Sequence, residues 1–401
     1  MKFAVVGGGI TGLVAARALA GAGHEVVVLE EAPRLGGKIR TVRSDGFLIE
    51  AGPDSFLARK PHAARLCREL GLDGSLIGSR EQRRVYVHAG DALHPLPRGV
   101  GLVPTLLEPI EQSGLFTPEE SARIAADLDL PGGAPEGDES LGSLIRRRMG
   151  QAALDRLVAP LIGGIYAADP ERLSVRATFP ELLEAERRKG SLIRGLAALA
   201  DGAARPDGVP PVPGSPFLTL AEGLETLVDR IVAASPGVTF RTSARIVGIE
   251  PAPGRYRLVS QDGEAVEADG VVLTVPAPSA AALLAPLAPV AAFLLAEIET
   301  VSTAVVTLAY RARDLGPLEG HGFVVARDQL PPITACAWTS AKWAGRAPQG
   351  WALVRAHLGS AVRPLDPDAD DERLVAAARE GLAVGMGAAA EPAAAWVARW
   401  S

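Results

Sequence analysis

The first thirty residues show an alternation of apolar runs, glycines and helical spacing. Residues 3–6 are apolar, three consecutive glycines follow, and residues 13–20 place alanine, leucine and valine at the spacing of a helix. A second apolar run at residues 26–29 leads into a carboxylate, Glu30. Two strands separated by one helix predict a parallel pair, because parallel neighbours need a crossover connection.

The rest of the chain shows three further patterns. Helical spacing dominates residues 102–200, and a stretch rich in proline and glycine at residues 206–216 marks a boundary. Short strands with a helix among them follow at residues 217–276, and we interpret them as the remainder of the first domain. Strand patterns at residues 303–357 and a helix at residues 371–384 predict an antiparallel sheet with a helix beside it.

The glycines after the first strand predict a phosphate-binding turn. Gly7 permits the tight turn, Gly9 lets the backbone approach a pyrophosphate, and Gly12 lets the helix pack close to the strand. Helix N-termini bind anions through unpaired N–H groups and a positive dipole end. The cofactor-binding residues predicted here are Gly7, Gly8, Gly9, Ile10, Thr11, Gly12 and Glu30.

Glu30 decides between a dinucleotide site and an ordinary turn. Glycine-rich turns without a ligand are common, so the motif alone is weak evidence. Here a second strand leads into an acid about twenty residues beyond the first glycines, as a contact to the adenosine ribose requires. The same carboxylate would repel a 2′-phosphate, which disfavours NADP.

A second glycine pair indicates a flavin dinucleotide. Gly36 and Gly37 allow another close approach of backbone to cofactor, whereas simple NAD dehydrogenases need nothing comparable after the second strand. Arg34 and Lys38 could neutralise a diphosphate or contact the edge of a flavin. A loop without chemical consequence is the alternative, and the first motif disfavours it.

Composition excludes several other classes of protein. The 401 residues carry a net charge of −6 and no basic tract, which argues against broad nucleic-acid binding. Cys67 and Cys336 form no CxxC, so dithiol–flavin exchange is excluded and a reducing compartment is expected. The six histidines lack the spacing of metal ligands, and we predict no metal site.

The default location is the cytoplasm. The chain begins directly with a strand instead of a signal peptide, and no apolar run is long enough to span a bilayer. The apolar stretch at residues 100–116 could line a lipophilic pocket or lie on a membrane surface. A buried core helix is the more frequent explanation of such a stretch.

Several stretches together resemble one family of flavoproteins. Residues 7–13, 26–41 and 49–61 are similar to it almost residue for residue, although general flavin oxidases share the first of them. The more specific matches are residues 160–170, Leu173, Ser174, residues 177–180, Glu186 and residues 341–350. Over essentially its whole length the chain resembles the protoporphyrinogen/coproporphyrinogen III oxidase family, within the amine-oxidase-like flavoproteins.

The resemblance implies an α/β fold (α+β overall) with three domains. A Rossmann-type FAD-binding domain would combine residues 1–76 with residues 214–276. An inserted helical domain, residues 96–200, would make peripheral contact with the inner face of a membrane. Residues 77–95 and 277–401 would form an antiparallel-sheet domain that binds the substrate.

The implied activity is oxidation of a porphyrinogen to a porphyrin in haem biosynthesis, with dioxygen as electron acceptor. The flavin would carry the redox chemistry, and the sequence shows no GxSxG nucleophile motif. Between protoporphyrinogen IX, with two propionates, and coproporphyrinogen III, with four, we favour the latter. The absence of a membrane span and of one arginine supports that choice.

The resemblance also assigns roles to residues by position. In some members an arginine after a Leu-Pro-x-Gly turn pairs with a substrate propionate, but Gly101 occupies that register here. Arg98 is the nearest cation and becomes the expected substrate contact, while no catalytic residue is assigned. The remaining cofactor contacts are Gly36, Gly37, Lys38, Ala51, Gly52, Pro53 and Asp54 near the flavin and, through its backbone, Val247 at the adenine.

One departure from the family lies at the end of the sequence. Members end with a glycine-rich segment and a helix around the flavin pyrimidine ring, and this sequence ends at Ser401 before it. A helix N-terminus there would stabilise negative charge on the reduced flavin. From the sequence we therefore expect loose FAD binding and slow turnover.

Two other functions stay open. The first is oxidation of an amine or a carotenoid by the same superfamily, which the few tyrosines and residues 160–170 disfavour. The second is a cofactor-binding or interaction protein without catalysis.

Overall fold

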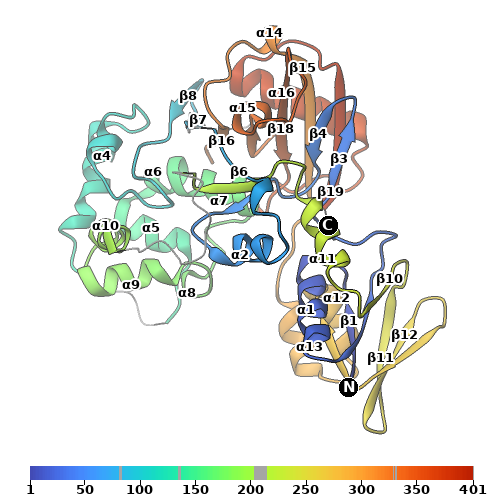
Figure 1. Cartoon of the computed structure of the whole chain (residues 1–401). Helices are drawn as coiled ribbons and strands as arrows, with labels where there is room; N and C mark the ends of the chain where they lie inside the picture. Colours follow the sequence, from blue (N-terminus) through green and yellow to red (C-terminus); the bar gives the residue numbers. More distant parts are fainter. Residues whose placement is uncertain (81–83, 134–136, 203–214, 328, 330–331, 401) are drawn as a thin grey trace. The chain divides into compact units, whose positions relative to one another are not determined.

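The computed structural model describes residues 1–80, 84–133, 137–202, 215–327, 329 and 332–400 (Figure 1). The chain divides into two compact units. The first comprises Met1–Gly78 and Pro206–Thr300, and the second comprises Ser79–Arg205 and Val301–Ser401. The first unit therefore contains both segments predicted for the FAD-binding domain, and the finer division into three domains stays a prediction.

The first unit is built on a parallel sheet with the strand order β10-β2-β1-β14. Its strands are β1 (Lys2–Val6), β2 (Glu25–Leu29), β10 (Val238–Arg241) and β14 (Gly270–Leu273). Helix α1, Ile10–Gly21, connects the two inner strands. The predicted strand–turn–helix–strand unit is confirmed, and the two outer strands come from the part of the chain after residue 237.

Both faces of this sheet are buried. Val5 and Val28 pack with Ala16 of α1 on one face. Ala4 and Val27 pack on the other face against a three-stranded antiparallel sheet. Its strands are β11 (Ile246–Ala252), β12 (Arg255–Ser260) and β13 (Ala265–Ala268). Burial on both faces explains why the inner strands are continuous apolar runs in the sequence.

The remaining elements of the first unit surround this framework. The strands are β3 (Thr41–Ser44), β4 (Phe47–Glu50), β5 (Phe56–Leu57), β6 (Leu76–Gly78) and β9 (Phe217–Leu220). The helices are α2 (Pro61–Glu69), α11 (Glu225–Ala233), α12 (Ala277–Leu284) and α13 (Pro289–Ala296), with a 3₁₀ turn at Asp73–Ser75.

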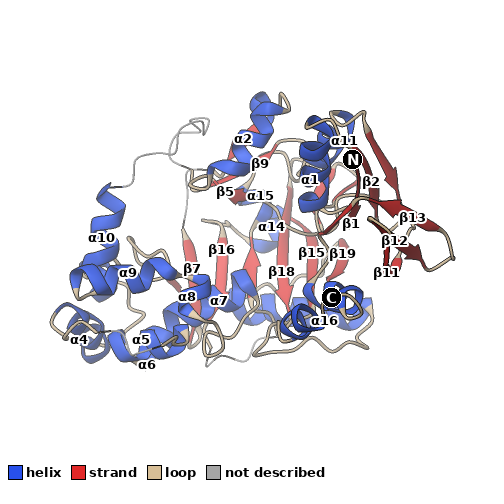
Figure 2. Cartoon of the chain, turned by 90° about the horizontal axis from the view of Figure 1, so that it is seen from below, coloured by secondary structure: helices blue, strands red, loops and turns tan. Residues whose placement is uncertain are grey.

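The second unit contains a seven-stranded sheet with the order β19-β15-β18-β17-β16-β7-β8. Its strands are β7 (Val85–Ala89), β8 (Ala92–Pro95), β15 (Thr303–Arg311), β16 (Gly322–Val325), β17 (Ala335–Ala337), β18 (Trp351–Leu358) and β19 (Ala394–Trp400). Figure 2 labels β7, β16, β18, β15 and β19 in this order along one row of strands, and β17 lies between β16 and β18. All pairs are antiparallel, as predicted, except the parallel pair of β16 with β7.

Helices from two parts of the chain, residues 96–200 and residues 371–386, pack against this sheet. Helix α16, Asp371–Met386, packs with Phe323, Val354 and Ala356 in one core. Val87, Val324 and further side chains of the sheet join a second core, to which the helices of residues 96–200 contribute. Short helices α14 (Ala312–Leu315) and α15 (Thr339–Lys342) connect strands.

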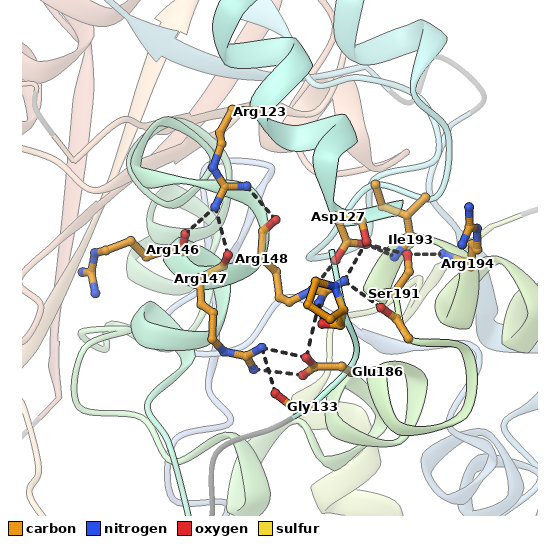
Figure 3. A network of polar contacts seen from close by, with 12 residues as sticks. Arg123, Asp127, Gly133, Arg146, Arg147, Arg148, Glu186, Ser191, Ile193 and Arg194 are labelled. Carbon is orange, nitrogen blue, oxygen red and sulfur yellow. Dashed lines mark hydrogen bonds and ion pairs between the residues drawn. The ribbon is translucent and has the colours of Figure 1, made fainter. Parts of the chain in front are cut away.

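Residues 96–200 are mainly helical, as predicted. The helices are α3 (Glu108–Glu111), α4 (Pro118–Ala125), α5 (Leu141–Met149), α6 (Gln151–Ala153), α7 (Ala159–Tyr166), α8 (Val175–Thr178), α9 (Pro180–Lys189) and α10 (Leu192–Gly202). A 3₁₀ turn at Ala126–Leu128 follows α4, and a π-helix at Leu154–Val158 leads into α7. A buried network of polar contacts joins α5, the 3₁₀ turn and the segment between α9 and α10 (Figure 3).

Residues 100–116 do not form the core helix that we considered. Only α3 is helical there, because Pro104 and Pro109 interrupt a continuous hydrogen-bond ladder. The expected burial is present nevertheless, since Val103, Ile110 and Leu115 are all less than 5% exposed. Within the described residues, no helix has the length and apolar character needed to cross a membrane.

Candidate functional site

The turn between β1 and α1 contains glycines that the fold itself requires. Gly7 has φ +107°, a conformation that side chains disfavour. A Cβ at Gly12 would overlap the carbonyl oxygen of Gly7, and a Cβ at Gly8 would come within 2.9 Å of Glu30 Cβ. Packing thus explains three of the four glycines without any ligand.

Gly9 is the exception. It is the N-cap of α1 with φ −70° and ψ 176°, an extended conformation open to every residue. A Cβ there would meet only Gly37 Cα, at an ordinary contact distance of 3.9 Å. Among the described residues, none requires glycine at this position by close contact, which leaves the backbone of the helix N-terminus open to a ligand.

Glu30 is placed to serve both the turn and a ligand. Its side chain is 8% exposed; Oε2 accepts the Gly8 N–H at 2.5 Å, and Oε1 accepts the Ala32 N–H at 2.8 Å. Each carboxylate oxygen can accept more than one hydrogen bond. The carboxylate can therefore hold the turn and still accept hydrogen bonds from ribose hydroxyls.

The structure brings the second glycine pair onto the first. The Gly36 N–H donates to the Gly8 carbonyl at 2.8 Å, and Gly36 forms a β-bridge with Gly9. Gly36 and Gly37 have φ values of +101° and +56°. A Cβ at Gly37 would lie 3.0 Å from Gly9 Cα, so the two segments cross with no side chain between them.

The other predicted cofactor contacts lie in the same unit. Lys38 and Pro53 are exposed, Asp54 is half-buried, and Ala51 and Gly52 are buried beside the end of β4. The Ala51 N–H donates to the Arg40 carbonyl at 2.9 Å. This bond ties the segment to residues 35–40, which contain the second glycine pair and are called the second glycine loop below.

Val247 lies at an irregular point of the antiparallel sheet. Its side chain is 54% exposed, and the register of β11 with β12 shifts between Ile246 and Gly248. The shift leaves backbone groups available at this position. The roles of these residues and of the glycines toward a cofactor stay predictions.

Thr274 is a residue of the turn that sequence reasoning missed. It follows β14, and its hydroxyl lies 2.9 Å from the Gly7 carbonyl and 3.0 Å from the Val6 carbonyl. A Cβ at Gly7 would come within 2.9 Å of Thr274 Oγ1. The one signal in the sequence is a hydroxyl residue directly after an apolar run.

Glu50 anchors a second support that the sequence did not reveal. Its side chain is 3% exposed; Oε2 accepts the Thr41 hydroxyl at 2.9 Å, and Oε1 accepts the Leu224 N–H at 2.8 Å. Glu225 Oε2 accepts the Thr41 N–H at 3.0 Å. These contacts hold the beginning of β3, directly after the second glycine loop, against the beginning of α11.

The predicted substrate residue belongs to the second unit. Arg98 is exposed on the loop after β8, and Gly101 on the same loop has no atom within 4 Å of a Cβ built on it. A side chain at residue 101 would thus be sterically free. The role of Arg98 stays a prediction.

The segment at residues 160–170 presents apolar side chains to solvent. A Cβ at Gly164 of α7 would lie 3.0 Å from Val324 Cγ1, so the helix packs closely on the sheet of the second unit. Ile165 and Tyr166, at the end of the helix, are 65% and 55% exposed. Ala167 ends the helix in the left-handed conformation with φ +54°.

Comparison with known proteins identifies the flavin. The family model described as flavin containing amine oxidoreductase matches residues 10–401. The chain belongs to this family. It is an oxidoreductase, and FAD is its cofactor, as predicted.

Curated relatives narrow the comparison within the family. The coproporphyrinogen III oxidase of Bacillus subtilis (strain 168) is 35% identical over 99% of this chain and 85% of its own length. The coproporphyrinogen III oxidase of Propionibacterium freudenreichii is also 35% identical, over 99% and 79%. The chloroplastic protoporphyrinogen oxidase 1 of Spinacia oleracea is 29% identical over 92% and 68%.

Solved structures confirm the fold class. The crystal structure of "Putative protoporphyrinogen oxidase" from Exiguobacterium sp. 255-15 has a TM-score of 0.86 and 35% identity, covering 99% of this chain and 86% of that one. Cyclohexylamine oxidase from Brevibacterium oxydans has a TM-score of 0.72 and 17% identity, covering 100% and 84%. The second likeness concerns the fold alone.

Proposed function

We propose that this chain oxidises a porphyrinogen to the corresponding porphyrin in haem biosynthesis, with coproporphyrinogen III as the preferred substrate. The observation that carries the proposal is an identity of 35% over 99% of the chain with proteins named coproporphyrinogen III oxidase. The amine oxidase with the same fold is only 17% identical. Amine oxidation is therefore the weaker candidate.

The reaction removes six electrons and six protons from the macrocycle. Bound FAD would supply the hydride acceptor for each of three rounds, with dioxygen as the final electron acceptor. The overall balance is one porphyrinogen and three dioxygen molecules giving one porphyrin and three hydrogen peroxide molecules. The product ratio therefore tests the mechanism directly.

The residues of this chain bind and orient the two organic molecules. Gly9 and the N-terminus of α1 would receive the diphosphate, and the Glu30 carboxylate would accept the ribose hydroxyls. In the second unit, exposed Ile165 and Tyr166 offer apolar contact area, and Arg98 offers a guanidinium to a carboxylate arm. A macrocycle with propionate arms needs both kinds of surface.

The test is aerobic turnover by the full chain with FAD added. Porphyrin fluorescence and peroxide release are recorded with coproporphyrinogen III, protoporphyrinogen IX and cyclohexylamine as separate substrates. We expect fastest oxidation of coproporphyrinogen III and three peroxides per porphyrin.

Two outcomes would overturn parts of this proposal. Faster oxidation of protoporphyrinogen IX would reverse the substrate preference and keep the reaction. Peroxide released with the amine and with neither porphyrinogen would replace the proposal with amine oxidation.

Peripheral contact with a membrane through residues 96–200 stays a prediction, as does a cytoplasmic location. Val103, Ile110, Leu115 and Phe116 of the stretch at 100–116 are buried, and Leu106, at 54%, is the large apolar side chain there that is exposed. Binding of the full chain to vesicles would test this contact.

A further inference from the structure

Arg34 makes three backbone contacts inside the second glycine loop, residues 35–40. Its Nη1 donates to the carbonyl oxygens of Leu35 and Ile39, each at 3.0 Å, and its Nη2 donates to that of Gly37. Three carbonyls within five residues thus converge on one side chain. A guanidinium suits this task because it carries five donors in a rigid fork and no acceptor.

The guanidinium is half-buried among other charges. Burial lowers the pKa of Arg34, and the nearby charge of Arg40 lowers it further. The negative charges of Glu225 and Glu30 raise it, but they do not cancel the effect of burial. Arginine keeps its proton in proteins even so. The charge is therefore retained, and carbonyl dipoles of its own loop solvate it.

These contacts fix which way the peptide groups of the loop face. In a planar trans peptide the N–H of one residue points opposite to the C=O of the residue before it. With the carbonyls of residues 35, 37 and 39 turned toward Arg34, the N–H groups of residues 36, 38 and 40 face away from it. Gly36 confirms this direction, because its N–H donates to the Gly8 carbonyl at 2.8 Å.

We propose that Arg34 is a positioning residue that orders the loop before FAD binds and turns the N–H groups of residues 38 and 40 toward the cofactor. A row of N–H groups on one side of a loop favours an anion. This role differs from the direct contact to a diphosphate that the sequence suggested for Arg34. The inference rests on the FAD site and is independent of the substrate.

The experiment compares Arg34→Met with Arg40→Met in the full chain stripped of FAD. Arg40 is exposed on the same loop, so its replacement removes the same unit of charge. For each variant, the FAD dissociation constant is measured at several salt concentrations, together with the thermal midpoint and the hydrogen exchange of the amides at residues 36–40 without FAD. Arg34→Lys serves as the conservative variant.

We expect Arg34→Met to weaken FAD binding about tenfold, as it would if the ordered loop were populated in one molecule of ten. The loop amides should exchange faster even without FAD, while the thermal midpoint stays near that of Arg40→Met. The salt dependence of FAD binding should run parallel to that of the unmodified chain. Arg34→Lys should recover part of the affinity, because an ammonium keeps three donors.

Three results would overturn the proposal. The first is equal FAD affinity in Arg34→Met and Arg40→Met. The second is unchanged loop exchange with a flatter salt dependence, which would make Arg34 a direct diphosphate contact. The third is a drop in thermal midpoint without any change in FAD affinity, which would make its role purely structural. If Arg34→Met fails to fold, the same comparison is made with Arg34→Lys. If the unmodified chain itself does not bind FAD, the FAD site on which the proposal rests is wrong.

Discussion

Single residues of the two glycine segments differ in what requires them to be glycine. Residue 12 must be glycine because the carbonyl oxygen of Gly7 occupies the position of a Cβ there. Residue 7 must be glycine because its φ is positive. Gly9 satisfies neither condition. The protein therefore separates glycines that build the turn from one that leaves space beside it.

Replacing Gly9 by alanine should weaken FAD binding, whereas replacing Gly12 by alanine should lower the stability of the fold. Gly9→Ala should leave the thermal midpoint of the FAD-free chain within about 2 °C, because a surface change usually costs about 0.5 kcal/mol or less. FAD should bind at least about tenfold more weakly, since the methyl group would occupy ligand volume. Gly12→Ala should cost about 1–3 kcal/mol or more through overpacking.

Thermal melting and FAD titration of both variants check this expectation. If Gly9→Ala binds FAD with unchanged affinity, no ligand contacts the backbone at this turn. If Gly12→Ala melts at the midpoint of the unmodified chain, the turn relaxes more easily than its close contact indicates.

The sequence predicts the glycines of the site but not the groups that hold them. A local motif is sufficient for the glycines, because their roles follow from one turn and its flanking strand and helix. The Thr274 hydroxyl reaches Gly7 across 267 residues, and Glu50 reaches Leu224 across 174. No spacing rule connects partners that only the assembled sheet brings together.

Among the elements, helix α5 shows how the helical segment is held in place. Arg123 donates from Nη1 to the Arg148 carbonyl at 2.9 Å and from Nη2 to the carbonyls of Arg146 at 3.2 Å and Arg147 at 2.9 Å (Figure 3). A cation that caps the last carbonyls of a helix also complements its dipole. The end of α5 is thereby tied to α4.

A buried ion pair joins the same helix to its other neighbours. Arg148 Nε donates to Asp127 Oδ1 at 2.6 Å, and Nη2 donates to the Gly190 carbonyl at 2.7 Å. Asp127 Oδ2 in turn accepts the Ser191 hydroxyl at 2.6 Å and the Ile193 N–H at 3.0 Å (Figure 3). The side chains of Arg148 and Asp127 are 1% and 0% exposed, and Arg148 also lies 3.5 Å from the buried Glu186, so Asp127 is the partner that would lose its counter-ion if the pair were broken.

Arg148→Met should therefore destabilise the second unit by about 3–5 kcal/mol, the usual cost of breaking a buried ion pair. Arg187→Met is the matched control: Arg187 is 72% exposed and pairs with Glu184, and such surface pairs contribute about 1 kcal/mol or less. All five tryptophans lie in the second unit, so their fluorescence in guanidinium reports its unfolding. Equal losses in the two variants would contradict the expectation.

Helices and strands with a clear periodic spacing of apolar residues were predicted well, and features that depend on distant parts of the chain were not. The pair β1–β2 and helix α16 follow their sequence patterns closely. The stretch at residues 100–116 has the expected burial without the considered helix, because prolines overrule its apolar character. The parallel pairing of β16 with β7 depends on the assembled sheet and has no local signal.

At the scale of the whole molecule, each unit buries one thiol. Cys67 is 0% exposed in the first unit, and Cys336 is 2% exposed in the second. Burial raises the pKa of Cys67 to about 11, with a smaller contribution from Asp73, and burial raises that of Cys336 to about 12. Both folded units therefore favour the protonated thiol.

These shifts make the stability of both units fall in alkali. An acid whose pKa is higher in the folded state keeps its full contribution below the unfolded pKa of about 9, and that contribution is lost as the pH rises toward the folded value. The guanidinium midpoint of the second unit should thus decline above about pH 9. It should decline less steeply in Cys336→Ala, and tryptophan fluorescence at pH 7, 9 and 10.5 measures both. Parallel declines in the two proteins would show that other groups cause the loss.

The strand order β10-β2-β1-β14 also has a consequence for biosynthesis. The inner strands and both glycine segments lie within the first forty residues to be synthesised, yet neither flanking strand exists before residue 238. Thr274, which holds the Gly7 carbonyl, comes later still. A nascent chain must therefore carry an unfinished nucleotide turn while residues 79–205 of the other unit are translated, so the helical segment is complete before the cofactor can be captured.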